Sequence, residues 1–204
     1  IFGVNCAGVW KISGPGSPVF VDDTGDWYSR QSLGGLDVEG GRIALTSWNC
    51  LFEITITGGL SKSLPAGTSG VCGAITQPQN DPDVTFRGDG QPAAYGWTRL
   101  FSPRHLATAQ DGTVYFADTG NARVRSITPD GVINTVAGGG ESIATGDGYS
   151  GTSVGLHMPM GVALSPDESK LWISDAASNV VWSLSLPSPE ESEVYEIPTP
   201  DGSA

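Results

Sequence analysis

The sequence lacks several features that mark common classes of protein. Its 204 residues include only two histidines, two methionines and three cysteines. No apolar run approaches the roughly 20 residues that span a bilayer. Basic residues are also scarce, since ten Lys and Arg stand against 22 Asp and Glu and give a formal net charge of −12. Binding phosphates needs a basic face that releases counterions, so we expect no nucleic-acid partner. Because there is no long apolar run, we also expect no membrane insertion.

Motifs of several enzyme and metal sites are missing as well. There is no Gly-X-Ser-X-Gly segment for a nucleophilic serine and no glycine-rich phosphate loop. Calcium held by Asp89 and Asp147 stays an alternative, although neither lies in a dense run of carboxylates. The prediction is therefore a protein without a metal or another cofactor.

What the sequence has in abundance is glycine and proline. The 29 Gly and 14 Pro separate short apolar segments, a composition typical of many short strands joined by tight turns. The three cysteines permit at most one internal disulfide. The chain begins at Ile1, which suggests a processed chain or an excerpt of a longer one.

Two Asp-Thr-Gly triplets, at residues 23–25 and 118–120, raise the hypothesis of an aspartic protease. Such an enzyme needs two carboxylates at equivalent positions, close enough to share a proton. The two triplets occupy different places in the repeat described next, which argues against a protease. We instead interpret Asp118 as an Asx-type turn that bonds nearby amides, with Gly120 at a positive φ.

A repeat of about 57 residues indicates the fold. Residues 103–140 align with residues 159–197, so that Pro103 matches Pro159 and Asp118 matches Asp175. Asp-Gly pairs between alternating apolar segments predict hairpins. In the central copy we expect four strands at residues 105–110, 113–118, 122–128 and 132–137. Four antiparallel strands recurring at such a period predict an all-β protein, a β-propeller of four-stranded blades.

Weaker copies extend the repeat toward the N-terminus. In residues 35–67, "RIALTSW" falls on "TVYFADT", and residues 1–23 are consistent with three strands of a further blade. We expect one propeller domain with three complete blades and one partial blade. Its predicted parts are a partial blade (1–23), blades (24–67, 100–138 and 156–197), connectors (68–99 and 139–155) and a tail (198–204).

The central copy resembles a known family. Its "P…DGTVYFADTGNARVRSITPDGVINTVAG", preceded by "GDG.PA…L.SP", is similar to the NHL repeat of bacterial, plant and teneurin-like propellers. The resemblance covers roughly residues 35–197 and is weakest in the first copy. Because propellers of this family usually have more blades, it implies an excerpt, a small closed ring, or a protomer completed by neighbouring subunits.

The resemblance also implies an alternative enzymatic function. Related propellers include lactonases, strictosidine-synthase-like enzymes and lyases, whose sites lie in the central channel, and the amidating lyases hold zinc there with three histidines. In this chain only His105 lies near the start of a strand that would line the channel, and His157 is not its repeat equivalent. We therefore expect no enzyme.

The long connectors indicate which face makes contacts. In a propeller they emerge beside the turns between the second and third strands of each blade, and loops of this length are commonly functional. Cys72 is expected to form a disulfide there with Cys50 or Cys6. The predicted interaction face comprises Trp48, Asp89, Gln91, Tyr95, Trp97, Asp118, Asn121, Glu141, Asp147 and Tyr149.

These observations together predict a non-enzymatic interaction or structural assembly module. We expect an extracellular or cell-surface location and a partner that is a protein, a glycan or a further copy of the chain. Trp172 and Trp182 lie within predicted strands, and we expect both to pack between blades.

Overall fold

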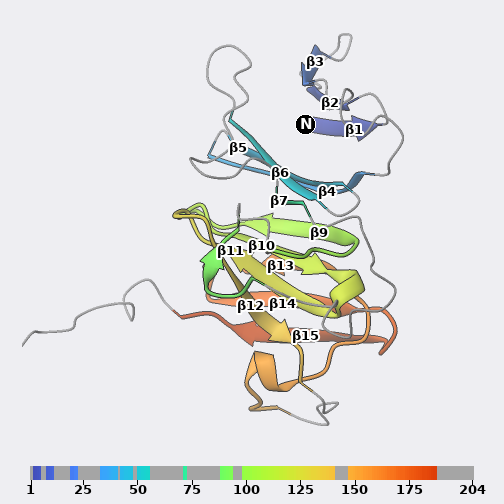
Figure 1. The fold of residues 1–204 in the computed structure, drawn as a ribbon, viewed down its shortest axis with the longest axis vertical. Helices are drawn as coiled ribbons and strands as arrows, with labels where there is room; N and C mark the ends of the chain where they lie inside the picture. Colours follow the sequence, from blue (N-terminus) through green and yellow to red (C-terminus); the bar gives the residue numbers. More distant parts are fainter. Residues whose placement is uncertain are drawn as a thin grey trace, which may run out of the picture.

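The computed structural model shows a mostly β protein built of antiparallel sheets (Figure 1). It describes residues 2–5, 8–11, 19–22, 33–40, 42–47, 50–55, 71–72, 88–93, 98–140 and 147–187. The helices in these ranges are two three-residue 3-10 turns, η1 (Thr119–Asn121) and η2 (Gly151–Ser153). Neither is long and apolar enough to cross a membrane.

The described strands form four sheets that follow one another along the chain. Their order and bounds are β1 (Phe2–Asn5), β2 (Gly8–Lys11) and β3 (Val19–Asp22); β4 (Leu33–Glu39), β5 (Arg42–Ser47), β6 (Cys50–Thr55) and β7 (Val71–Cys72); β8 (Gln91–Pro92), β9 (Pro103–Thr108), β10 (Val114–Asp118), β11 (Arg123–Ile127) and β12 (Val132–Gly138); and β13 (Pro159–Leu164), β14 (Lys170–Asp175) and β15 (Val180–Ser185).

The third sheet, hereafter the central sheet, has the four strands that the sequence predicts. β9, β10, β11 and β12 pair in chain order as antiparallel neighbours, with bounds within two residues of those expected. Its hairpins form where the Asp-Gly pairs stand. Gly112 and Gly131 have φ of 92° and 85°, a region that glycine enters at little cost. The turn chemistry therefore sets the strand ends.

The sheets stack face to face in chain order. β4 packs on β9 and β9 on β13, so the first full strand of each sheet lies beside its counterpart in the next (Figure 1). Side chains also bridge the sheets, since Asp37 Oδ2 accepts a bond from the Thr108 amide at 2.6 Å. In Figure 1 the first and last sheets lie at opposite ends of the stack, so the described residues form no closed ring.

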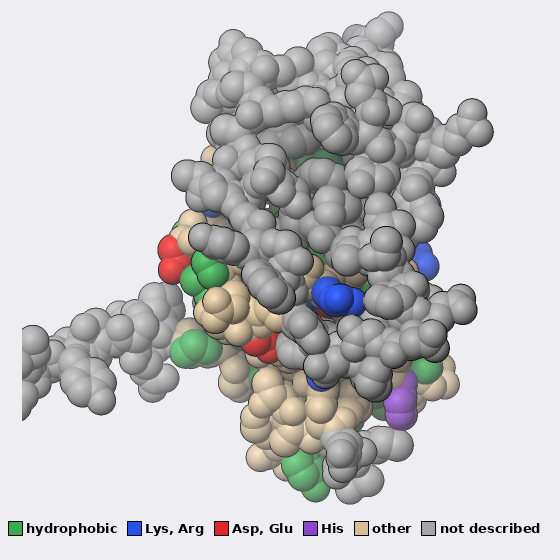
Figure 2. Space-filling model, in the orientation of Figure 1, with side chains coloured by type: hydrophobic (Ala, Val, Ile, Leu, Met, Phe, Trp, Pro, Cys, Tyr) green, Lys and Arg blue, Asp and Glu red, His purple; other side chains and the backbone are tan. Residues whose placement is uncertain are grey.

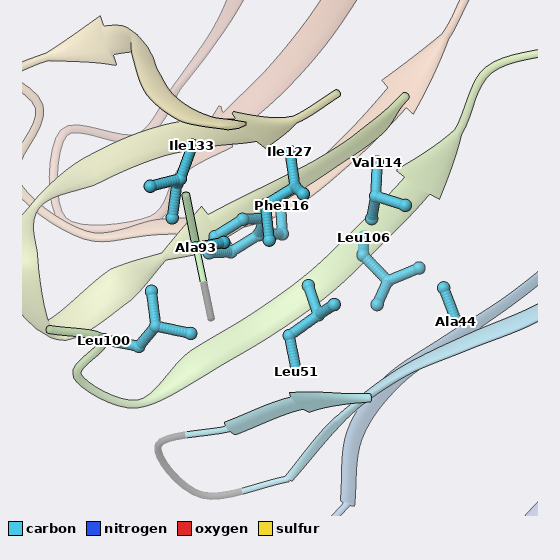
Figure 3. Close-up of a cluster of buried hydrophobic side chains, with 9 residues drawn as sticks. All are labelled: Ala44, Leu51, Ala93, Leu100, Leu106, Val114, Phe116, Ile127 and Ile133. Carbon is cyan, nitrogen blue, oxygen red and sulfur yellow. The ribbon is translucent and has the colours of Figure 1, made fainter. Parts of the chain in front are cut away.

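Two hydrophobic layers hold the central sheet. On one side, Leu106, Phe116 and Ile133 pack against Ala44 and Leu51 of the preceding sheet (Figure 3). The opposite side contributes Ala107, Ala117 and Val124 and meets the last sheet, β13–β15, through Val162, Leu171 and Ile173. The central sheet is therefore buried on both faces.

Several features differ from the sequence prediction. β7 is the fourth strand of its sheet, although it lies in residues 68–99, predicted as a connector. β8, in the same segment, adds a fifth strand beside β12. The last sheet has three described strands, and its predicted fourth strand falls beyond residue 187. These short or late strands depend on distant partners, which the local sequence does not reveal.

The two tryptophans of the last sheet behave differently. Trp182 packs against the layer between the central and last sheets, as predicted. Trp172 is 43% exposed, so the prediction that it packs between blades is wrong for the described residues. The cause is strand alternation, because Trp172 points to the face of the last sheet that the central sheet does not cover.

Candidate functional site

A buried aspartate ends the second strand of both the central and the last sheet. Asp118 of β10 and Asp175 of β14 are each fully buried. Asp118 Oδ1 accepts a bond from the Phe101 amide at 2.8 Å. Asp175 accepts bonds from the amides of His157, at 3.0 Å, and Met158, at 2.7 Å. Each carboxylate thus fixes the backbone just before the proline that begins β9 or β13.

This geometry corrects the interpretation of Asp118. Its amide partner lies 17 residues earlier in the chain, so it is not a local Asx turn. Gly120 is not at a positive φ, and the left-handed residue is Ala122, with φ 52°. What Gly120 provides is space, since a Cβ there would lie 2.6 Å from the Phe101 carbonyl oxygen. The turn is therefore specified by close approach to Phe101.

Arg125 connects this carboxylate to the preceding connector. Its guanidinium is fully buried, 3.7 Å from Asp118 Oδ2 and 3.1 Å from Asp89 Oδ1. It also donates to the Arg99 carbonyl at 3.2 Å, and the Asn121 amide donates to Asp118 at 2.8 Å. A single cation thus bonds two parts of the connector and the end of a strand.

The two aspartates titrate differently. Burial raises the pKa of Asp118 to about 6, against the opposing effects of the Asn121 and Phe101 bonds and of Arg125. Burial also acts on Asp175, but bonds from His157, Met158 and Ser178 outweigh it and lower the pKa of that carboxyl. Both are charged at neutral pH, and neither is held protonated as a general acid would be.

The structure brings some of the predicted interaction residues together and separates others. Asp89, Asp118 and Asn121 meet around Arg125. Gln91 lies instead on β8, opposite Ile133, at the outer edge of the central sheet. Asp147 and Tyr149 are exposed in the segment before η2, which packs on β12. Predicted residues outside the described side chains are Trp48, Tyr95, Trp97 and Glu141.

The strand register bears on the predicted disulfide. Cys50 of β6 and Cys72 of β7 are directly opposite each other as Cα partners, whereas Cys6 lies outside the described residues. Opposite residues on antiparallel strands have Cα atoms about 4.5–5.5 Å apart, within the range that a disulfide spans. The backbone therefore permits the Cys50–Cys72 pairing, which stays a prediction.

Sequence reasoning missed the exposed side chains at the entry to β9 and β13. Phe101 is 44% exposed and lies over Gly120, and His157 and Met158 are exposed at the matching place in the last sheet. The Thr119 hydroxyl donates to the Pro159 carbonyl at 2.5 Å and joins the two places. We call this surface, Phe101, Thr119, Gly120, His157 and Met158, the connector face. The sequence pattern that could have revealed it is position: Phe101 and His157 each stand two residues before the proline at which the repeat begins.

The polar groups nearby include a histidine beside a serine. His157 Nδ1 lies 2.8 Å from the Ser178 hydroxyl, which suggests a nucleophilic serine. That hydroxyl, however, donates its proton to Asp175 at 2.8 Å. His105 Nδ1 lies 2.9 Å from the Val162 carbonyl, between two inner strands. Among the described residues no group of three His, Cys, Asp or Glu side chains is placed to hold a metal.

The described surface shows no large patch of one chemical kind in the view of Figure 2, where basic, acidic and hydrophobic side chains are scattered. The connector face offers single aromatic, imidazole and thioether groups, and the backbone that carries them is held by Asp118 and Asp175.

Comparison with solved structures shows a propeller-like fold. The chain is similar to an auxiliary nutrient binding protein from Bacteroides thetaiotaomicron VPI-5482, with 19% identity and a TM-score of 0.58 over 88% of this chain and 43% of that one. The chain is also similar to the auxiliary nutrient binding protein from Bacteroides ovatus ATCC 8483, with 20% identity and a TM-score of 0.59 over 87% of this chain and 42% of that one. A chain in a structure of the nidogen/laminin complex is similar with 17% identity and a TM-score of 0.50 over 89% of this chain and 52% of that one.

These likenesses concern the fold alone. The chain spans about half or less of the length of each of these structures. No family model and no curated protein matches the sequence, so membership in the NHL family stays a prediction. The chain is a mostly β protein of antiparallel sheets with propeller-like structural neighbours.

Proposed function

We propose that this chain is a non-enzymatic, propeller-like binding module that acts outside the cell or on its surface. Its connector face contacts a protein or a glycan. The observation that carries this proposal is the ion-pair network of buried Arg125 and Asp118 with Asp89, which fixes the connector against the β10–β11 turn.

The network matters because it fixes the binding surface in advance. The Asp118 carboxylate holds the Phe101 amide, and Gly120 receives the Phe101 ring, of which 44% remains exposed. A partner that stacks on this ring need not immobilise it, which lowers the entropic cost of binding. In protein interfaces a few large side chains near the centre carry most of the binding energy, and we assign that role to Phe101.

Two further observations support a binding function. Two of the similar structures are described as nutrient-binding proteins. In addition, the hydroxyl of Ser178 donates to Asp175, which disfavours an attacking serine at the most enzyme-like group of side chains. An enzyme of the lactonase or lyase type is the alternative function.

The test is a binding screen with matched variants. Wild-type protein is applied to arrays of glycans and of extracellular-matrix proteins, and the strongest interaction is measured by calorimetry. We expect Phe101→Ser to weaken it by roughly 30-fold, the scale of a central interface aromatic. Gln110→Ser, at an exposed position in the turn between β9 and β10, serves as the control.

Three outcomes would contradict the proposal. One is that no glycan or matrix protein binds. Another is that both variants weaken binding equally, which would place the contact elsewhere. The third is turnover of lactone or glycosidic substrates by the purified chain, which would favour the enzyme.

A further inference from the structure

The last sheet has an open face that is built like a covered one. By the strand register, this outer face includes Gly161, Lys170, Ser183 and Ser185. Its other residues are Ala163, Trp172, Ser174 and Val181, and all of these except Ser174 are exposed. Val181 is 66% exposed and Trp172 43%, so two large apolar side chains lie open on the same face of the sheet.

Each of the latter four outer-face residues has a repeat equivalent in the central sheet. The equivalents are Ala107, Tyr115, Ala117 and Val124. Ala107, Ala117 and Val124 are buried, and Tyr115 is partly buried against the same layer. Together they pack on Val162, Leu171 and Ile173 of the last sheet. The same four positions therefore form a sheet-to-sheet interface once in this chain and are left open the second time.

The charge of the outer face also suits association. The chain carries 22 acidic residues and a net charge of −12, so contact between copies is generally opposed by repulsion. The outward-pointing positions of β13–β15 include no acidic residue, and Lys170 stands among them. An acid-free face on an acidic chain is where a second copy meets the least repulsion.

We propose that the outer face of the last sheet binds the first sheet, β1–β3, of a second copy of this chain. The sheets stack in chain order through β1 with β4, β4 with β9 and β9 with β13, so continuing the stack from β13–β15 brings in another β1–β3. The contact is heterologous, head to tail, and therefore yields rings or filaments. It lies on a surface separate from the connector face, so the two proposals stand or fall independently.

The first test is the mass in solution. Sedimentation velocity over a range of concentrations is expected to show wild-type protein associating. Val181→Lys should weaken association by roughly tenfold or more, because the contact would desolvate an ammonium group. Gln110→Lys changes an exposed side chain in the turn between β9 and β10 and should associate as wild type does. A wild-type monomer at every concentration, or unchanged association of Val181→Lys, would overturn the proposal.

The second test identifies the partner surface without weakening the contact. Trp172 is replaced by the photoreactive aromatic residue benzoylphenylalanine, and protein labelled with ¹⁴N is mixed with protein labelled with ¹⁵N before irradiation. We expect cross-linked peptides that join position 172 to residues 2–22 of the other isotope. Cross-links within one isotope only would mean that the chain covers its own face. Cross-links between two copies of position 172 would mean a symmetric dimer, and either result would overturn the head-to-tail contact.

Discussion

The central and last sheets use the same repeat in two different surroundings. β10 of the central sheet is buried on both faces, whereas β14 of the last sheet alternates between buried and exposed residues. The face toward the preceding sheet is buried in both cases, through Phe116 in one and Ile173 in the other. Burial of the opposite face is thus decided by the next sheet in the stack.

The buried aspartates separate two roles that the repeat combines. Asp118 and Asp175 both fix the backbone that enters the next strand. Among the described residues, only Asp118 of this pair has an arginine beside it, and Trp182 of the last sheet stands where Arg125 stands in the central one. The aspartate therefore does not need the arginine to hold the backbone. Arg125 serves to attach Asp89 of the connector.

The largest expected effect comes from removing the arginine. Arg125→Met leaves the carboxylate of Asp118 buried without its cation, so we expect a loss of about 3–5 kcal/mol in the free energy of unfolding. Urea unfolding followed by fluorescence measures it. Arg104→Met, which changes an exposed arginine of the same sheet, should cost less than about 0.5 kcal/mol.

A double variant sharpens this result. Asp118→Asn combined with Arg125→Met removes both charges, and we expect its cost to be smaller than the sum of the single costs. If the cost of the double variant equals the sum of the two single costs, the two side chains do not interact. The comparison between the two sheets would then rest on packing alone.

The next effect concerns the pH at which each aspartate titrates. The folded-state pKa of Asp118, about 6, lies above its unfolded value of 3.8, so the folded state binds the proton more tightly. Protonation of Asp118 therefore stabilises the folded state below pH 4. This stabilisation, about 3 kcal/mol, is lost as the pH rises through 6. Asp175 has a lowered pKa, so its ionised carboxylate stabilises the folded state, and this stabilisation is lost as the pH falls through the folded-state pKa.

Carboxyl ¹³C chemical shifts followed between pH 2 and 8 measure both groups directly. We expect the Asp118 signal to move near pH 6 and the Asp175 signal below its ordinary range. Midpoints for both near the ordinary value of 3.8 would remove the electrostatic difference between the sheets. Asp118→Asn assigns the first signal.

A third comparison uses one residue type at one repeat position. Val124 is fully buried and Val181 is 66% exposed. We expect Val124→Ala to lower the free energy of unfolding by about 2 kcal/mol, because it removes buried methyl groups. Val181→Ala should change it by less than about 0.5 kcal/mol in dilute protein. A comparable cost at both positions would mean that the outer face of the last sheet is covered even in the monomer.

The sequence predicts what local chemistry determines. Asp-Gly pairs place the strands of the central sheet within two residues, because the turns need no distant partner. The pairing of Asp118 with Phe101 escaped prediction because it joins residues 17 apart. β7 and β8 escaped because a two-residue strand exists only through its partner. The exposure of Val181 escaped prediction because the same residue type, Val124, stands at the equivalent position of the central repeat, where it is buried.

The smallest expected effect concerns the left-handed residue that follows each turn. Ala122 in the central sheet and Asn179 in the last one are repeat equivalents with φ of 52° and 55°. Asparagine tolerates this region better than alanine, so Ala122→Asn should raise the free energy of unfolding by about 0.5–1 kcal/mol. Asn179→Ala should lower it by a similar amount, and Ala122→Gly tests the backbone effect without a new side chain. If Ala122→Asn and Ala122→Gly both destabilise the protein, close packing of the Ala122 methyl group outweighs backbone strain, and the two turns are not equivalent in energy even though they share a conformation.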